Sequence, residues 1–166
     1  MERRRRVLVG VIGPGDGALA QDLETAHRIG GLIAAEGWVT LTGGWNAGVM
    51  DAASRGAREA GGLTLGLLPS RDAEGASPAV ELAIPTGLGE ARNNLVVLAS
   101  DALVCCGMSP GTASEAALAI RAAKPLILVA PSAATRTFFG SFRQGAPIEV
   151  PDAEAAIAAL RQLVSA

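Results

Sequence analysis

The chain has 166 residues, a net charge of −2 at pH 7, and 49% apolar against 18% charged residues. This length suits one domain with its own core, and the composition excludes a disordered chain. The near-neutral charge argues against a nucleic-acid binder, which usually presents a basic face, and no apolar run is long enough to span a membrane.

Short β-branched apolar runs alternate with amphipathic stretches along the chain. The apolar runs predict strands at residues 6–12, 38–42, 63–68, 79–84, 102–106 and 125–130, the fourth of them peripheral. The amphipathic stretches predict helices at residues 18–36, 47–60, 88–100, 112–123 and 152–164. Residues 71–78 are expected to form a surface loop, and residues 131–144 show no clear pattern. This alternation predicts an α/β, single-domain Rossmann-like parallel sheet with helices on both faces, spanning residues 1–166.

The N-terminus is basic, and we expect residues 1–6 to form a solvated tail. The apolar run that follows it is too short for a secretory signal. Cys105 and Cys106 are neighbours in an apolar run, so a disulfide between them would be strained, and we expect reduced thiols in a buried strand. They lack the spaced partners of a zinc site. We therefore expect no bound metal and a cytoplasmic location.

Three glycine-rich segments, residues 13–17, 43–48 and 107–112, follow predicted strands and lead into predicted helices. In open α/β sheets, ligands bind beyond the carboxyl ends of the strands. The N–H groups at a helix start are unpaired and suit a phosphate. None of the segments matches the glycine patterns of nucleoside triphosphatases or dinucleotide-binding proteins. The residues expected to contact a phosphorylated small molecule are Gly13, Gly15, Gly43, Gly44, Asn46, Gly107, Ser109, Gly111 and Thr112.

Two features near these segments have both a structural and a functional interpretation. Thr112-Ala113-Ser114-Glu115 has the spacing of a helix capping box, and spacing alone favours that role over ligand binding. Trp45 either stacks on a flat ring or fills space beneath its turn, and the sequence does not separate the two. His27, on the first predicted helix, lies away from the strand ends, so no catalytic role is expected.

Several blocks of the sequence, in order, resemble the Lonely Guy superfamily, long labelled as lysine decarboxylases. Thr42-Gly43-Gly44 with Gly48-Val49-Met50-Asp51-Ala52 is similar to its GGG…GLMGA turn and helix. Ala91-Arg92-Asn93-Asn94, the strand entry Ser100-Asp101-Ala102, and Gly107 to Glu115 resemble its arginine helix and PGGxGTxxE motif. Pro125-Leu126-Ile127-Leu128 resembles its following strand. The resemblance covers residues 7–129.

The resemblance implies an enzyme that cleaves the N-glycosidic bond of AMP or N6-modified AMP, releasing the base and ribose 5-phosphate. Arg92 and Glu115 match the family's catalytic pair. A carboxylate beside the sugar would stabilise the positive charge that develops as the bond breaks. Arg92 would neutralise the phosphate or orient Glu115. No cofactor is required in this interpretation, and a homodimer or larger homo-oligomer is implied, with the helices carrying Arg92 and Thr112 near the interface.

The sequence departs from the family motif where Gly107-Met108-Ser109, and then Pro110, stand in place of Pro-Gly-Gly. A subgroup of the same superfamily, which includes carrier proteins for molybdenum cofactor, is more similar in its ARN and GTxxE blocks. The alternative function is therefore a non-catalytic carrier that binds molybdenum cofactor, a pterin with a terminal phosphate. A pyridoxal-phosphate decarboxylase is disfavoured, because the only lysine, Lys124, precedes a strand at the edge opposite the glycine turns.

Overall fold

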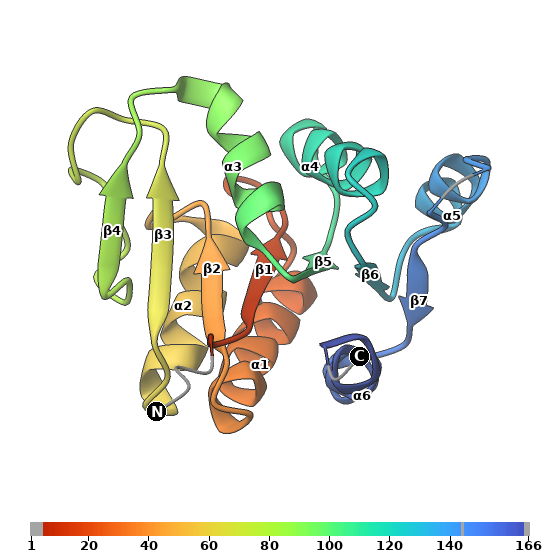
Figure 1. The fold of residues 1–166 in the computed structure, drawn as a ribbon, viewed down its shortest axis with the longest axis horizontal. Helices are drawn as coiled ribbons and strands as arrows, with labels where there is room; N and C mark the ends of the chain where they lie inside the picture. The colour runs from red at the N-terminus through yellow and green to blue at the C-terminus, as the bar shows by residue number, and fades with distance from the viewer. Residues whose placement is uncertain (1–4, 144, 165–166) are drawn as a thin grey trace.

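The computed structural model describes residues 5–143 and 145–164. Within these residues, every strand belongs to one parallel seven-stranded sheet with the order β4-β3-β2-β1-β5-β6-β7 (Figure 1). The strands are β1 (Leu8–Ile12), β2 (Val39–Thr42), β3 (Thr64–Leu68), β4 (Leu82–Pro85), β5 (Ala102–Cys106), β6 (Leu126–Val129) and β7 (Ile148–Val150). The helices are α1 (Ala20–Ala35), α2 (Gly48–Glu59), α3 (Arg92–Ala99), α4 (Pro110–Arg121), α5 (Ala133–Gly140) and α6 (Ala153–Val164), with a short 3₁₀ turn, η1 (Gly89–Ala91).

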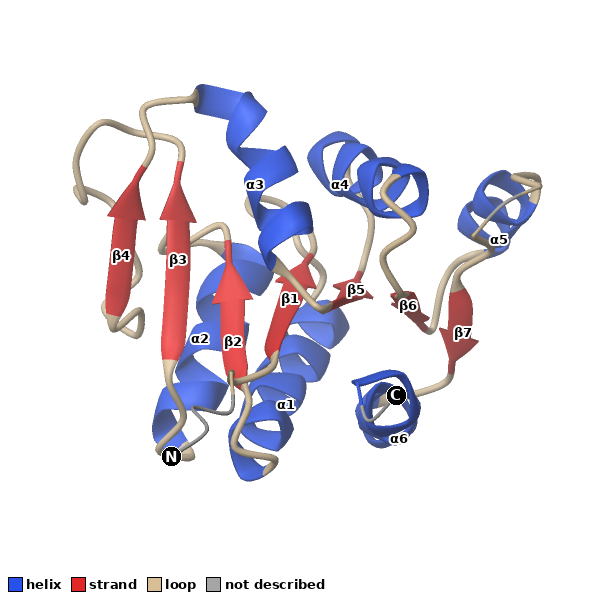
Figure 2. Ribbon diagram, in the orientation of Figure 1, coloured by secondary structure: helices blue, strands red, loops and turns tan. Residues whose placement is uncertain are grey.

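The helices cover both faces of the sheet (Figure 2). Residues of α1, α2 and α6 pack with one set of strand side chains, and residues of α3, α4 and α5 pack with the other. Strand β5 shows the alternation that this requires: Val104 belongs to the first core and Leu103 to the second. The predicted α/β Rossmann-like parallel sheet is therefore confirmed. No helix among the described residues has both the length and the apolar character needed to cross a membrane.

Cys105 and Cys106 lie in β5 as free, buried thiols, as predicted. Their side chains point to opposite faces of the sheet, so Cys106 joins the first core and Cys105 the second. Burial raises the pKa of Cys106 to about 12 and also raises the pKa of Cys105. Both therefore stay protonated near neutral pH and act as small apolar side chains.

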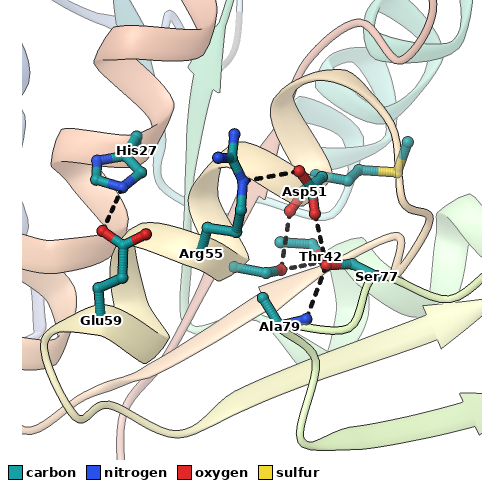
Figure 3. A network of polar contacts seen from close by, with 9 residues as sticks. His27, Thr42, Asp51, Arg55, Glu59, Ser77 and Ala79 are labelled. Atoms are coloured by element: carbon teal, nitrogen blue, oxygen red, sulfur yellow. Dashed lines mark hydrogen bonds and ion pairs between the residues drawn. The ribbon is translucent and has the colours of Figure 1, made fainter.

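Helices α1 and α2 approach each other closely because glycine stands at their contact. A Cβ on Gly30 would lie 2.0 Å from the carbonyl oxygen of Ala53, and one on Gly56 would lie 1.9 Å from that of His27. Outside this contact, His27 Nε2 lies 2.8 Å from a carboxylate oxygen of Glu59 (Figure 3). His27 thus joins two helices at the surface, away from the strand ends.

The C-terminal part contains two elements that the sequence did not predict. Helix α5 occupies part of the segment 131–144, with Ser132 as its N-cap, whose Oγ accepts a hydrogen bond from the N–H of Thr135 at 3.2 Å. Strand β7 has three residues, two of them exposed, which is too few for a readable alternation. Within the predicted basic tail, Arg5 pairs with Asp101 at 3.0 Å, whereas residues 1–4 lie outside the described part, as does Gln144.

Several predicted boundaries were wrong. β1 and α1 each begin two residues later than predicted, and α3 begins at Arg92 rather than residue 88, after the 3₁₀ turn η1. The fourth strand begins at Leu82 rather than residue 79, because Ser77 to Val80 form a turn closed by the N–H of Val80 and the carbonyl of Ser77 at 3.0 Å. The strand does lie at the edge of the sheet, as expected. Helix α4 begins at Pro110 rather than Thr112. Proline suits the first position of a helix, where its missing N–H would have no partner.

Candidate functional site

The strand order places a switch point between β1 and β5. From β1 the chain adds β2, β3 and β4 on one side, then returns through α3 to place β5 on the other side of β1. Ligands of open α/β sheets bind beyond the carboxyl ends of the strands at such a point. Gly13 follows β1 and Gly107 follows β5, so the first and third glycine segments flank it.

A cleft of about 190 Å³ opens at this place, and we call it the head-group cleft. Its volume is smaller than the roughly 300–1,000 Å³ typical of small-molecule sites, so it suits part of a ligand rather than a whole nucleotide. The structure brings together most of the residues singled out from the sequence. They are Gly13, Gly15, Gly43, Trp45, Arg92, Ser109, Gly111, Thr112 and Glu115.

Arg92 is the first residue of α3 and is 6% exposed. Its guanidinium lies over Gly43, where a Cβ would come within 2.2 Å of Nη1. Its Nε is buried and has no hydrogen-bond partner among the described residues. Burial lowers the pKa of Arg92, and the carboxylates of Glu115 and Glu90 oppose that effect. A buried cation with a free donor in a cleft is costly for the isolated chain and is relieved by a bound anion.

Glu115 faces the same cleft from α4 and is 7% exposed. Burial raises the pKa of its carboxyl to about 7; Arg92 counteracts this, whereas Glu90 adds to it. The ion pairs within 4.0 Å among residues 5–143 and 145–164 do not include one between Arg92 and Glu115. The direct contact through which Arg92 was expected to orient Glu115 is thus not formed, and the two groups face the cleft without binding each other.

The capping box predicted at Thr112 to Glu115 is wrong. The N-cap of α4 is Ser109, whose Oγ accepts a hydrogen bond from the N–H of Thr112 at 3.3 Å and lies 2.9 Å from Thr112 Oγ1. Glu115 therefore sits inside the helix, where it caps nothing. The sequence misled because Pro110 moves the helix start two residues earlier, and Ser109 then supplies the cap.

The start of α4 offers fewer free donors than the sequence suggested. Pro110 has no N–H, and Ser109 occupies the N–H of Thr112 with a long hydrogen bond. The N–H of Gly111 remains without an intrahelical acceptor. At the start of α2, the N–H of Val49 is bonded to the carbonyl oxygen of Pro14 at 2.9 Å. The free N–H of Gly111 therefore lies in the head-group cleft with Arg92, whereas the N–H of Val49 is already bonded within the protein.

The departure at Met108 and Ser109 leaves the head-group cleft open. Met108 turns toward the second core and lines a different cavity, of about 380 Å³, with Leu128 and Ser132. Only Ser109 of the two adds a side chain to the head-group cleft, and that side chain is the α4 cap. The substitution of side chains for glycines at these positions thus changes the cap and does not fill the cleft.

Three of the predicted contact residues lie outside the head-group cleft. Gly44 is buried against Gly66 and Leu68, with a φ of 80° that favours glycine. Gly107 faces the 380 Å³ cavity, next to the carboxylate of Asp22. Asn46 lines an adjoining cavity described below.

Sequence reasoning missed Met50, Glu90 and Asn93, which also line the cleft. Asn93 donates a hydrogen bond to Ser114 Oγ at 3.3 Å. Because it follows Arg92 within a quoted family block, the sequence could have indicated it as a site residue. Met50 also lay within a quoted family block, whereas Glu90 lay outside all of them. Lys124, in contrast, does not line the cleft. It donates to the carbonyl oxygens of Leu98 and Ser100 at 3.0 and 2.6 Å, at the C-terminal end of α3.

A Rossmann-like sheet with a buried arginine and a glycine-flanked helix start at its switch point defines a protein of the Lonely Guy-like class. The chain belongs to the SLOG cluster4 family, which matches residues 6–157. The resemblance inferred from the sequence blocks is therefore confirmed.

Solved structures resemble the chain over nearly its whole length. The molybdenum cofactor binding protein from Rippkaea orientalis is 44% identical, with a TM-score of 0.94 and coverage of 96% of this chain and 98% of that one. The molybdenum cofactor carrier protein from Chlamydomonas reinhardtii is also 44% identical, with a TM-score of 0.92 and coverage of 98% and 100%. An uncharacterised protein from Archaeoglobus fulgidus is 38% identical over 123 residues, which cover 74% of this chain and 80% of that protein.

Proposed function

We propose that this chain binds a phosphorylated pterin as a carrier of molybdenum cofactor. The observation that carries the proposal is the buried, incompletely paired guanidinium of Arg92 beside the N-terminus of α4, in a cleft at the switch point of the sheet. The names of the two relatives that are 44% identical support this choice of ligand. The cofactor is cargo in this proposal, and the chain supplies a binding site rather than a reaction.

The terminal phosphate of the ligand would occupy the head-group cleft. Arg92 would donate to it from Nε and the two Nη atoms of its guanidinium, and the N–H of Gly111 would donate from the start of α4. The hydroxyls of Ser109 and Thr112 lie beside this position. With a pKa of about 7, Glu115 is partly neutral at physiological pH, which reduces its repulsion of the phosphate.

The carrier proposal is tested by the content of the protein purified from cells that make molybdenum cofactor. We expect molybdenum and a phosphorylated pterin to co-purify with the wild-type chain. Gly43→Ala should reduce both, since its Cβ would displace the Arg92 guanidinium and the sulfur of Met50. Gly140→Ala is the matched control, because a Cβ there meets nothing within 4 Å. Equal pterin content in all three proteins, or none in any, would contradict the proposal.

The second candidate function is a phosphoribohydrolase acting on AMP or N6-modified AMP. One observation favours it: Arg92 and Glu115 face the same cleft, and a carboxyl with a pKa of about 7 is suited to proton transfer near neutral pH. Incubation with AMP and with N6-isopentenyl-AMP, followed by assay of ribose 5-phosphate, tests it. Release by the wild-type chain well above that of Glu115→Ala would establish this activity, whereas equal release would remove it.

A further inference from the structure

A second cavity adjoins the head-group cleft, and we call it the side cavity. It measures about 450 Å³ and is lined by Asp16, Trp45, Asn46, Met50 and Gly75, among others. The two spaces share Gly15, Trp45 and Met50. A ligand whose phosphate lies beside Arg92 can therefore extend its remaining part past Trp45 into the side cavity.

The indole of Trp45 packs against the loop between β3 and β4. Its six-membered ring lies on the bare backbone of Gly75, where a Cβ would come within 2.1 Å of Cζ3. Two backbone hydrogen bonds join the two chain segments that make this contact: Asn46 N–H donates to Gly75 O at 3.0 Å, and Ser77 N–H donates to Gly44 O at 2.8 Å. The half-buried indole also lines both spaces, so it is a preorganised surface for a flat ring.

A network of side chains anchors the same loop on α2 (Figure 3). Ser77, which is 2% exposed, donates from Oγ to Asp51 Oδ1 at 2.7 Å, and Arg55 Nε donates to the other carboxylate oxygen of Asp51 at 2.8 Å. Ser77 Oγ also accepts from the N–H of Ala79 at 3.1 Å. This network ties the loop that carries Gly75 and Ser77 to α2, and it supports the contact between Gly75 and Trp45.

The carboxylate of Asp16, one of the two polar side chains that line the side cavity with Asn46, favours one kind of ring edge. Asp16 is exposed and presents a carboxylate, which only accepts hydrogen bonds when ionised. A 2-amino-4-oxopyrimidine edge, as in pterin and guanine, presents a ring N–H and an amino group side by side, which match the two carboxylate oxygens. Adenine presents a ring nitrogen acceptor beside its amino group, so one carboxylate oxygen would face another acceptor.

We infer that the side cavity binds a planar ring with a 2-amino-4-oxopyrimidine edge, with Trp45 stacked on its face and Asp16 accepting from its N–H and amino groups. The inference rests on the proposed function, because it assumes that the phosphate lies in the head-group cleft. It goes further in assigning ring selectivity to two residues and in excluding adenine as the preferred base.

Calorimetric titrations with GMP, AMP and ribose 5-phosphate test the inference and the proposed function separately. We expect ribose 5-phosphate to bind, and GMP to bind at least about tenfold tighter than AMP, the size of effect that one charge-assisted hydrogen bond gives. Asp16→Asn should bring the ratio of GMP to AMP affinity near one and leave ribose 5-phosphate unchanged. Trp45→Leu should weaken both nucleotides about tenfold. Glu24→Gln, which removes an exposed carboxylate of α1, is the matched control.

The outcomes separate the two claims. If ribose 5-phosphate binds but GMP and AMP bind equally, or if Asp16→Asn keeps the preference, the inference on the ring is overturned and the phosphate site stands. If GMP is preferred in an Asp16-dependent way while ribose 5-phosphate does not bind, the ring site stands and the phosphate site fails. Binding of none of the three ligands overturns both. Titration of guanosine and 6-hydroxymethylpterin then shows which ring source is bound more tightly.

Discussion

At the residue scale, the central feature is a carboxyl and a guanidinium that face one cleft without pairing. Glu115 is buried with its charge incompletely compensated, and Arg92 lies over Gly43 with one buried donor unsatisfied. An arrangement of this kind lowers the stability of the empty chain and favours binding of an anion that uses the free donors. The stability cost is measurable through its dependence on pH.

The free energy of unfolding should fall as pH rises through the range in which Glu115 titrates. Its pKa is about 7 in the folded chain and near 4.5 otherwise, so the folded state retains a proton that the unfolded state has released. Stability from this group is therefore complete below about pH 4.5 and lost by about pH 7. In urea unfolding, Glu115→Gln should gain about 2 kcal/mol relative to the wild type between pH 5 and pH 8. A constant difference between the two proteins would contradict this assignment.

Many residues of the head-group cleft could be predicted from the sequence, because they belong to motifs that follow the ends of predicted strands. Arg92 and Glu115 were identified by their family blocks, and the strand order then brought them to one cleft. The role of Thr112 was not predictable from spacing, since the cap depends on where the helix begins. Glu90 was missed because a charged residue in a short turn has no distinguishing pattern, and Met50 was missed although it lay within a family block, because an apolar residue gave no reason to expect a binding role.

At the scale of elements, helices α1 and α2 pack closely against each other. Gly30 and Gly56 allow it, and a side chain at either position would strike backbone rather than a movable side chain. This contact places α2, with Met50 at its first turn, against the head-group cleft. The geometry of the cleft therefore depends on two glycines that are distant from it.

Gly30→Ala and Gly56→Ala should each destabilise the chain by about 2 kcal/mol or more, the cost of overpacking a close contact. Gly31→Ala is the control on the same helix, because a Cβ there would lie 3.5 Å from the carbonyl oxygen of Gly56, an ordinary contact. It should be neutral or stabilising, since alanine favours the helix. Thermal unfolding of the three variants checks this. If Gly30→Ala were as stable as Gly31→Ala, the close packing described here would be wrong.

Most elements were predicted from apolar runs and helical spacing, and their order gave the sheet. The exceptions have physical causes. Strand β7 pairs along three residues only, and α5 has eight residues with one buried side chain, Phe139, so neither has a periodic pattern. Parallel pairing with β6 and packing on the second core, rather than local sequence, stabilise them.

At the scale of the whole molecule, an apolar surface lies beside the site. Leu88, Leu95 and Leu98 are 50%, 37% and 51% exposed and belong to α3 and the turn that precedes it. Exposed apolar groups of this kind on one helix favour association. We propose that a second copy of the chain covers them, in the homo-oligomer that the family resemblance implies.

Leu98→Glu should shift the molar mass measured by light scattering toward that of a monomer. The charge would be buried without a partner if a second copy packs on α3. Glu24→Gln, on the opposite face of the sheet, should leave the mass unchanged. A monomeric wild-type chain, or an unchanged oligomer of Leu98→Glu, would contradict the proposed interface.

The central claim is that the cleft at Arg92 binds the phosphate of a pterin without cleaving the ligand. Calorimetric titration of a 6-substituted pterin with a terminal phosphate, beside the same pterin without it, tests that claim most directly. The account predicts saturable binding of the phosphorylated compound, at least about tenfold tighter than the other, a difference that corresponds to about 1.4 kcal/mol, with the ligand recovered intact. Equal affinity for the two compounds, or no binding of either, would contradict it.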